Sequence, residues 1–74
     1  MPFSKARWRK ATDINRKYAI FELVHEENIL LDIWFSDNGA LEVSFHRGIS
    51  NTAVNWDQFT NVIADGMRIA ESDK

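Results

Sequence analysis

Apolar and polar residues alternate along the middle of the chain, which is typical of β-strands with one buried face. Three segments, residues 18–24, 30–35 and 41–45, are rich in isoleucine, leucine, valine and aromatic residues. Aspartate, asparagine, glutamate and glycine lie between them, as expected of turns. The pattern therefore predicts three consecutive antiparallel strands joined by short loops.

The loop between the second and third segments decides which residues face each other. A three-residue loop of Asp37, Asn38 and Gly39, with Gly39 in the left-handed conformation, makes one face of the hairpin wholly apolar. A two-residue loop would mix apolar and polar residues on both faces, so we predict the longer loop. The expected pairs are Phe35 with Leu41, Ile33 with Val43, and Leu31 with Phe45.

The same reasoning predicts that Glu26, Glu27 and Asn28 form the loop of the first hairpin, with Asn28 left-handed. Leu23 would then face Leu31, Phe21 would face Ile33, and Ala19 would face Phe35. The opposite, open face of the sheet would carry the alternate residues, with Trp34 near its middle. These are Tyr18, Ile20, Glu22, Val24, Leu30, Asp32, Trp34, Glu42, Ser44 and His46.

The last part of the chain has a helical period. One apolar stripe is expected to pack on the sheet, with Thr52 as N-cap and Asp57 in the early turns. Its members are Trp56, Phe59, Ile63, Met67 and Ala70.

A second stripe of Val62, Gly66 and Ile69 widens the apolar arc of this helix to about 160°. One sheet does not require so wide an arc, and Gly66 would let another backbone approach closely. We therefore predict a homodimer contact at Val62, Gly66 and Ile69; the alternative is a helix sunk deep in its own monomer. A chain of 74 residues without cysteine has a small core and no disulfide, which favours support from a second subunit.

The net charge of −2 hides two opposite parts of the chain. Residues 1–17 carry a net charge of +5 and residues 18–74 a net charge of −7. We treat residues 1–17 as a basic arm and residues 18–74 as a single domain. The arm is either a solvated terminus or a phosphate-binding segment, and Trp8 favours the second interpretation. The sequence does not decide whether residues 1–17 form an extra strand of the sheet or a loose tail.

An enzyme is not expected. His25 and Glu26 begin like a helical zinc motif, but Ile29 stands where the second histidine is required. Ser44, His46 and Asp32 supply the residue types of a catalytic triad, yet an open sheet surface has no pocket to exclude water. We predict no metal, no cofactor and no membrane span, since the apolar runs are too short. A cytoplasmic protein is expected, nucleoid-associated if bacterial.

An ordered set of motifs resembles the positive cofactor four family of single-stranded-DNA-binding transcriptional coactivators. The strand Ile-Leu-Leu-Asp-Ile at residues 29–33 is followed by His-Arg-Gly-Ile-Ser at residues 46–50. Trp56 then opens the helix, and Gln58, Phe59, Ile63 and Asp65 follow. The similarity covers roughly residues 18–70.

The resemblance implies a four-stranded antiparallel sheet followed by one helix, and a homodimer with its helices at the interface. It also implies that the curved sheets bind single-stranded DNA through aromatic and basic side chains. His46 and Arg47 match the basic pair of the family, and Trp34 lies near its aromatic position. Glu22, Glu26 and Glu27 stand where the family has basic residues in the first hairpin, and Asn51 replaces an apolar residue.

We thus expect an α+β fold, a curved antiparallel β-meander of three to four strands followed by one C-terminal helix, as a homodimer. The expected function is binding of single-stranded DNA, with RNA left open, and a role as a transcriptional cofactor. The alternative is a homodimeric protein-interaction module of the same fold that does not bind nucleic acid. The candidate nucleic-acid-binding residues are Arg7, Trp8, Arg9, Lys10, Arg16, Lys17, Trp34, His46 and Arg47.

Overall fold

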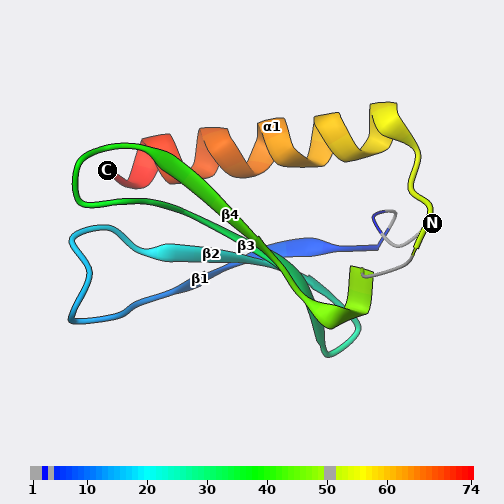
Figure 1. Ribbon diagram of the computed structural model, residues 1–74, viewed down its shortest axis with the longest axis horizontal. Helices are drawn as coiled ribbons and strands as arrows, with labels where there is room; N and C mark the ends of the chain where they lie inside the picture. Colours follow the sequence, from blue (N-terminus) through cyan, green and yellow to red (C-terminus); the bar gives the residue numbers. More distant parts are fainter. Residues whose placement is uncertain (1–2, 4, 50–51) are drawn as a thin grey trace.

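The computed structural model describes residues 3, 5–49 and 52–74. Four strands form one antiparallel sheet in the order β1-β2-β3-β4, and a single long helix lies along one of its faces (Figure 1). The elements are β1 (Arg7–Ala11), β2 (Ile20–His25), β3 (Asn28–Phe35), β4 (Leu41–Phe45), the short 3-10 helix η1 (Arg47–Ile49) and α1 (Trp56–Asp73). The predicted α+β meander with a C-terminal helix is confirmed. Part of the basic arm forms the extra strand, β1.

The predicted register of the second hairpin is confirmed. Phe35 pairs with Leu41, Ile33 with Val43 and Leu31 with Phe45. Gly39 has a φ of 91°, and its N–H donates to the carbonyl of Ser36 at 2.8 Å. Glycine adopts this left-handed conformation without a steric penalty, so the three-residue loop forms where the sequence expects it.

The predicted loop of the first hairpin is wrong. Leu23 does pair with Leu31 and Phe21 with Ile33, but His25 pairs with Asn28, which leaves a two-residue loop. Glu26, with a φ of 54°, is the left-handed residue, and Asn28 is not. A register shift between Leu23 and Val24 leaves one extra residue on the β3 side. Because of this bulge, the loop is one residue shorter than predicted while Leu23 still pairs with Leu31.

The start of α1 also differs from the prediction. The helix begins at Trp56, and Asn55, rather than Thr52, is its N-cap. Asn55 is extended, and its Oδ1 accepts the backbone N–H of Gln58 at 3.0 Å. This satisfies one of the free N–H groups of the first turn, which is what an N-cap does.

The core lies between α1 and the middle of the sheet. Leu23, Leu31 and Ile33 are its largest fully buried side chains. From α1, Ala70 is buried and Phe59, Val62 and Ile63 pack against the cluster. Trp56 and Met67, which were predicted to pack on the sheet, are instead exposed.

Contacts with Trp8 of β1 determine which face of α1 points toward the sheet. Its indole Nε1–H donates to the Val62 carbonyl at 3.2 Å, and its ring lies against Gly66. A Cβ placed on Gly66 would come within 2.4 Å of the ring, so only glycine fits there. The close approach predicted for a second subunit at Gly66 is made by Trp8 of the same chain. The Val62 and Gly66 stripe therefore faces the sheet.

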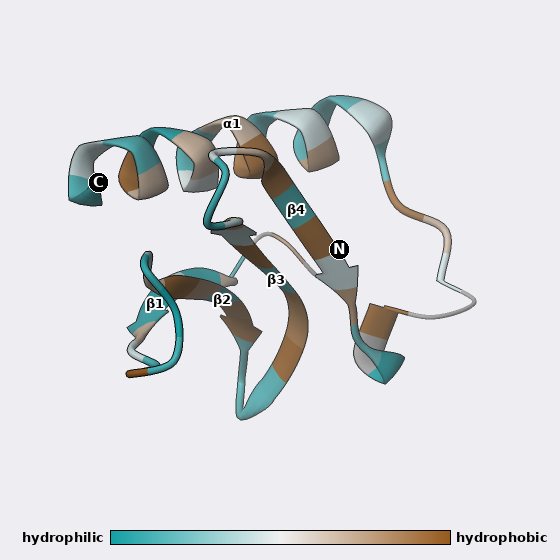
Figure 2. Ribbon diagram, turned by 60° about the vertical axis from the view of Figure 1, so that its left-hand side comes forward, coloured by the Kyte–Doolittle hydropathy of each residue, from teal (hydrophilic) through white to brown (hydrophobic). Residues whose placement is uncertain are grey.

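The helix leaves most of β4 uncovered, although the Phe45 ring stacks on Phe59 of α1 with 6.4 Å between the ring centroids. Leu41, Val43 and Phe45 point toward the side of the sheet that holds α1, yet they are 38%, 47% and 57% exposed. Apolar and polar bands alternate along β4 in Figure 2. One strand at the edge of the sheet thus keeps an apolar row in contact with solvent.

Candidate functional site

The face of the sheet away from α1 is not covered by that helix. Side chains alternate along a strand, so Trp8 and Lys10 lie on the helix side of β1 while Arg7 and Arg9 lie on the open side. Register then places Glu22, Asp32 and Ser44 in line with Arg9, one from each strand.

Three residues predicted for the open face are not part of its exposed surface. Val24 and Leu30 are buried, and Leu30 belongs to the core cluster together with Ile49 of η1. The ring of Tyr18 packs edge-on against the core residue Phe35, with 6.2 Å between ring centroids. Val24 still pairs with Arg7 and shares its face although it is buried. The bulge disturbs the pairing around Leu30, and β2 starts only at Ile20, after Tyr18.

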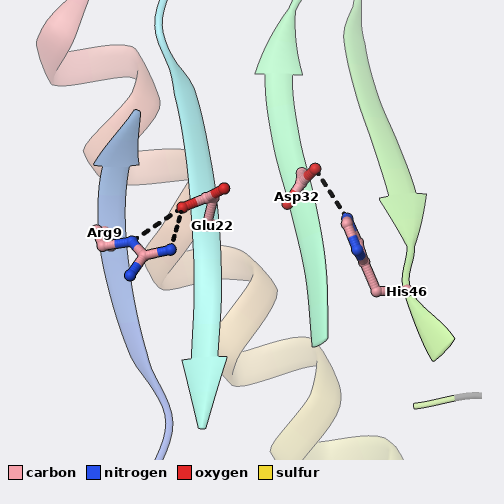
Figure 3. Close-up of polar contacts among 4 residues, drawn as sticks. All are labelled: Arg9, Glu22, Asp32 and His46. Carbon is pink, nitrogen blue, oxygen red and sulfur yellow. Dashed lines mark hydrogen bonds and ion pairs between the residues drawn. The ribbon is translucent and has the colours of Figure 1, made fainter. Parts of the chain in front are cut away.

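A row of four charged or titratable side chains crosses the open face (Figure 3). Arg9 donates from Nε and Nη2 to Glu22 Oε1, at 2.9 and 2.7 Å. His46 Nε2 lies 3.0 Å from Asp32 Oδ2. Glu22 and Asp32 are cross-strand neighbours at the centre of the row, so each acid has its basic partner on its outer side. Asp32 Oδ1 is buried and accepts no hydrogen bond from the residues that the structure describes.

Trp34 occupies the next position along β3 on the same face, and two polar groups fix its ring. Its Nε1–H donates to Glu42 Oε1 at 2.8 Å. The guanidinium of Arg16, from the loop between β1 and β2, lies 5.0 Å from the ring centroid. This is a cation–π contact, and Arg16 is also 3.6 Å from Asp13. A half-buried aromatic ring with an arginine over it thus lies at the surface of this face.

The other predicted basic residues divide between the two sides of the molecule. Arg7 and Arg47 are exposed and have no acidic partner among the residues that the structure describes. Lys10 is on the helix side, where its Nζ binds Asp73 at 2.8 Å. Lys17 Nζ lies 5.3 Å from the Tyr18 ring. Trp8 is held between sheet and helix, so its predicted stacking with bases is not supported by its position.

Other candidate chemistry is limited. Within the described ranges, no group of three or more His, Asp or Glu side chains is arranged to hold a metal ion. Ser44 makes no hydrogen bond to His46 in this part of the chain, although Asp32 does contact that histidine.

An apolar groove on the other side was not anticipated from the sequence. It has a volume of about 280 Å³ and lies between β4 and α1. A wider hollow of about 680 Å³ continues past the end of β4, where Phe45, Trp56 and Phe59 line it. The alternation in β4 indicates an apolar face, but no local signal tells whether a helix covers it.

Comparison with known proteins gives no relative. The sequence matches no protein-family model, no curated protein and no solved structure. The resemblance to the positive cofactor four family therefore rests on its motifs. Ser50 and Asn51, at the end of one motif, lie outside the described residues. Among the described residues, no helix is both long enough and apolar enough to cross a membrane.

Proposed function

We propose that the open face of the sheet binds single-stranded nucleic acid, with DNA as the first candidate. The observation that carries the proposal is the half-buried ring of Trp34 with Arg16 over it, on a face that also presents Arg7 and Arg9. Aromatic platforms stack bases with little sequence preference, and nearby cations bind the phosphates.

The contacts of Arg16 suggest how the site works. In the free chain its guanidinium covers the Trp34 ring and lies near Asp13. An incoming base would take the place of the guanidinium on the ring, and Arg16 would then bind the neighbouring phosphate. The hydrogen bond from Trp34 to Glu42 holds the ring during this exchange, which lowers the entropy cost of stacking.

The central acids are compatible with this proposal because each is partnered. Arg9 neutralises Glu22, and His46 contacts Asp32. Phosphates would follow the rim of the face, where Arg7 and Arg47 lack acidic partners among the described residues, while bases occupy the middle. A transcriptional role in a homodimer is the use that the family resemblance implies for such binding.

The test is the fluorescence anisotropy of a labelled mixed-sequence oligonucleotide of about 20 nucleotides, long enough to span such a site. Single-stranded DNA, the RNA equivalent and a duplex are compared at low and at physiological salt. We expect the single strand to bind best and salt to weaken it. Trp34→Ala should weaken binding by about 5- to 150-fold, the loss of one stacked base.

Arginine substitutions separate this interface from non-specific attraction. Arg7→Gln should reduce the slope of log affinity against log salt by about 0.7, the value for one phosphate contact of a single strand. Arg68→Gln is the matched control, because Arg68 lies on α1 and pairs with Asp65. Equal effects of both variants, or no binding of the wild-type chain at low salt, would refute the proposal.

The exposed apolar row of β4 favours the second candidate, a protein-interaction module. The titration distinguishes the two functions. A chain that binds neither single-stranded DNA nor RNA at low salt keeps only the interaction surface as its function.

A further inference from the structure

The sheet has two edges, and they differ in chemistry. β1 presents Arg7, Arg9 and Lys10, and charged residues at an edge discourage another strand from pairing there. β4 has the sequence Leu-Glu-Val-Ser-Phe, with no lysine, no proline and no register shift in its pairing with β3. Glu42 is the one charged residue of β4, so the protection of this edge is weaker than that of β1.

Hydrogen bonds at its two ends show which backbone groups of β4 face outward. The N–H of His46 donates to the Leu30 carbonyl at 2.9 Å, and the N–H of Ser36 donates to the Ala40 carbonyl at 2.8 Å. Residues 40 and 46 thus bond toward β3, and by alternation so do residues 42 and 44. The N–H and C=O groups of Leu41, Val43 and Phe45 point away from the sheet.

The same three residues also carry the exposed apolar side chains. Their outward backbone groups lack a partner within the described part of the chain. Of the side chains, Phe45 is partly covered because its ring stacks on Phe59 of α1, whereas Leu41 and Val43 line the open groove beside the helix. A strand that joined this edge would satisfy the hydrogen bonds, and its alternate apolar residues would extend the apolar row.

We propose that a second copy of the chain occupies this edge, with the two β4 strands antiparallel and a two-fold axis at Val43. Val43 would then face its own copy and Leu41 would face Phe45 of the other copy. Every outward N–H and C=O of these residues would find a partner, and Glu42 would lie opposite Ser44. The two sheets would become one continuous eight-stranded sheet.

This register is favoured over its neighbours. A shift of two residues in one direction moves the two-fold axis to Glu42, so that Glu42 lies opposite its own copy and the like charges repel. A shift of two residues in the other direction moves the axis to Ser44, and Leu41 then has no β4 residue of the second copy opposite it. The ends of β4 also complement each other in charge. His46 and Arg47 follow the strand, and Asp37 lies in the loop before it, so antiparallel pairing brings basic and acidic ends together.

The proposal does not depend on nucleic-acid binding, and it moves the dimer contact away from the predicted stripe of Val62, Gly66 and Ile69. Val62 and Gly66 face Trp8, whereas Ile69 is 40% exposed. This difference provides a control for the test.

The first test measures mass by light scattering and sedimentation at about 1 to 100 µM protein without nucleic acid. The wild-type chain should have twice its mass of 8.6 kDa. Val43→Lys places two lysines across the axis and should weaken the dimer at least about a hundredfold, as expected of like charges in contact. Ile69→Lys should leave the dimer intact. Circular dichroism should show that both variants remain folded.

The second test uses the absence of cysteine from the chain. A single cysteine in Val43→Cys would face its own copy at a Cα separation of about 5.5 Å, within disulfide range. Mild oxidation should cross-link this variant rapidly and leave Ile69→Cys largely uncross-linked. A wild-type monomer at 100 µM, or a dimer broken by Ile69→Lys and not by Val43→Lys, would overturn the proposal.

Discussion

The contact between Trp8 and Gly66 gives the sharpest prediction for the fold. Replacing Gly66 by alanine adds a Cβ at 2.4 to 2.8 Å from three ring atoms of Trp8. The ring cannot move away without stretching its hydrogen bond to the Val62 carbonyl. Overpacking of this kind costs about 2 to 3 kcal/mol, in the upper part of the usual range.

Helix propensity acts in the opposite direction. Alanine in place of a glycine inside a helix stabilises by about 1 kcal/mol. Gly66→Ala should therefore lower the free energy of unfolding by about 1 to 2 kcal/mol in total. For a domain of this size the corresponding fall in Tm is about 5 to 15 °C.

A double-mutant cycle with Trp8→Leu isolates the contact. The smaller side chain removes the ring, so Gly66→Ala should be stabilising in that background, by up to about 1 kcal/mol. Urea denaturation followed by circular dichroism measures all four proteins. The coupling energy should be about 2 to 3 kcal/mol, and helix propensity cancels from it.

Two results would refute this reasoning. An equal effect of Gly66→Ala in both backgrounds would mean that Trp8 does not fill the space beside Gly66. If the loss of stability in Gly66→Ala depended on protein concentration, Gly66 would lie at an interface between two copies of the chain instead.

Three further predictions concern caps, turns and charge. Asn55→Ala should cost about 1 kcal/mol because the N-cap bond is lost, whereas Asn61→Ala within the same helix should cost nothing; urea denaturation compares them. Glu26→Gly should raise the unfolding free energy by about 0.5 to 1 kcal/mol by relieving its positive φ, and an unchanged or lower value would argue against that conformation. Glu22→Gln should release Arg9 and strengthen single-strand binding at low salt, measured by anisotropy; weaker binding would contradict the proposed interface.

Local patterns predicted the second hairpin because its information is local. Gly39 supplies the left-handed residue that the loop requires, and a one-residue slip would expose the apolar face. The first hairpin lacks such a glycine. Its left-handed residue is Glu26, a type that rarely adopts this conformation, and a bulge shifts the register. The sequence therefore predicted the pairs near the core, Leu23 with Leu31, and not the loop itself.

The candidate site was predicted in part. Alternation placed Trp34, Glu22, Asp32 and Ser44 on one face, as the structure has them. It did not pair Arg9 with Glu22, because the position of the basic arm relative to β2 has no local signal. Nor did it separate Arg7 and Arg9 from Lys10, which the pleat of β1 sends to opposite faces.

The sequence by itself determined the order of the three central strands and the helix, the apolar face of the second hairpin, and the register where a glycine fixes the turn. The tertiary structure decided what covers each face. A helix about 10 Å wide spans about two strands spaced 4.8 Å apart, so it cannot cover a sheet of four. Trp8 of β1, 54 positions before Val62, ties the helix to that edge of the sheet through a hydrogen bond. The apolar row of β4 is left uncovered for that reason.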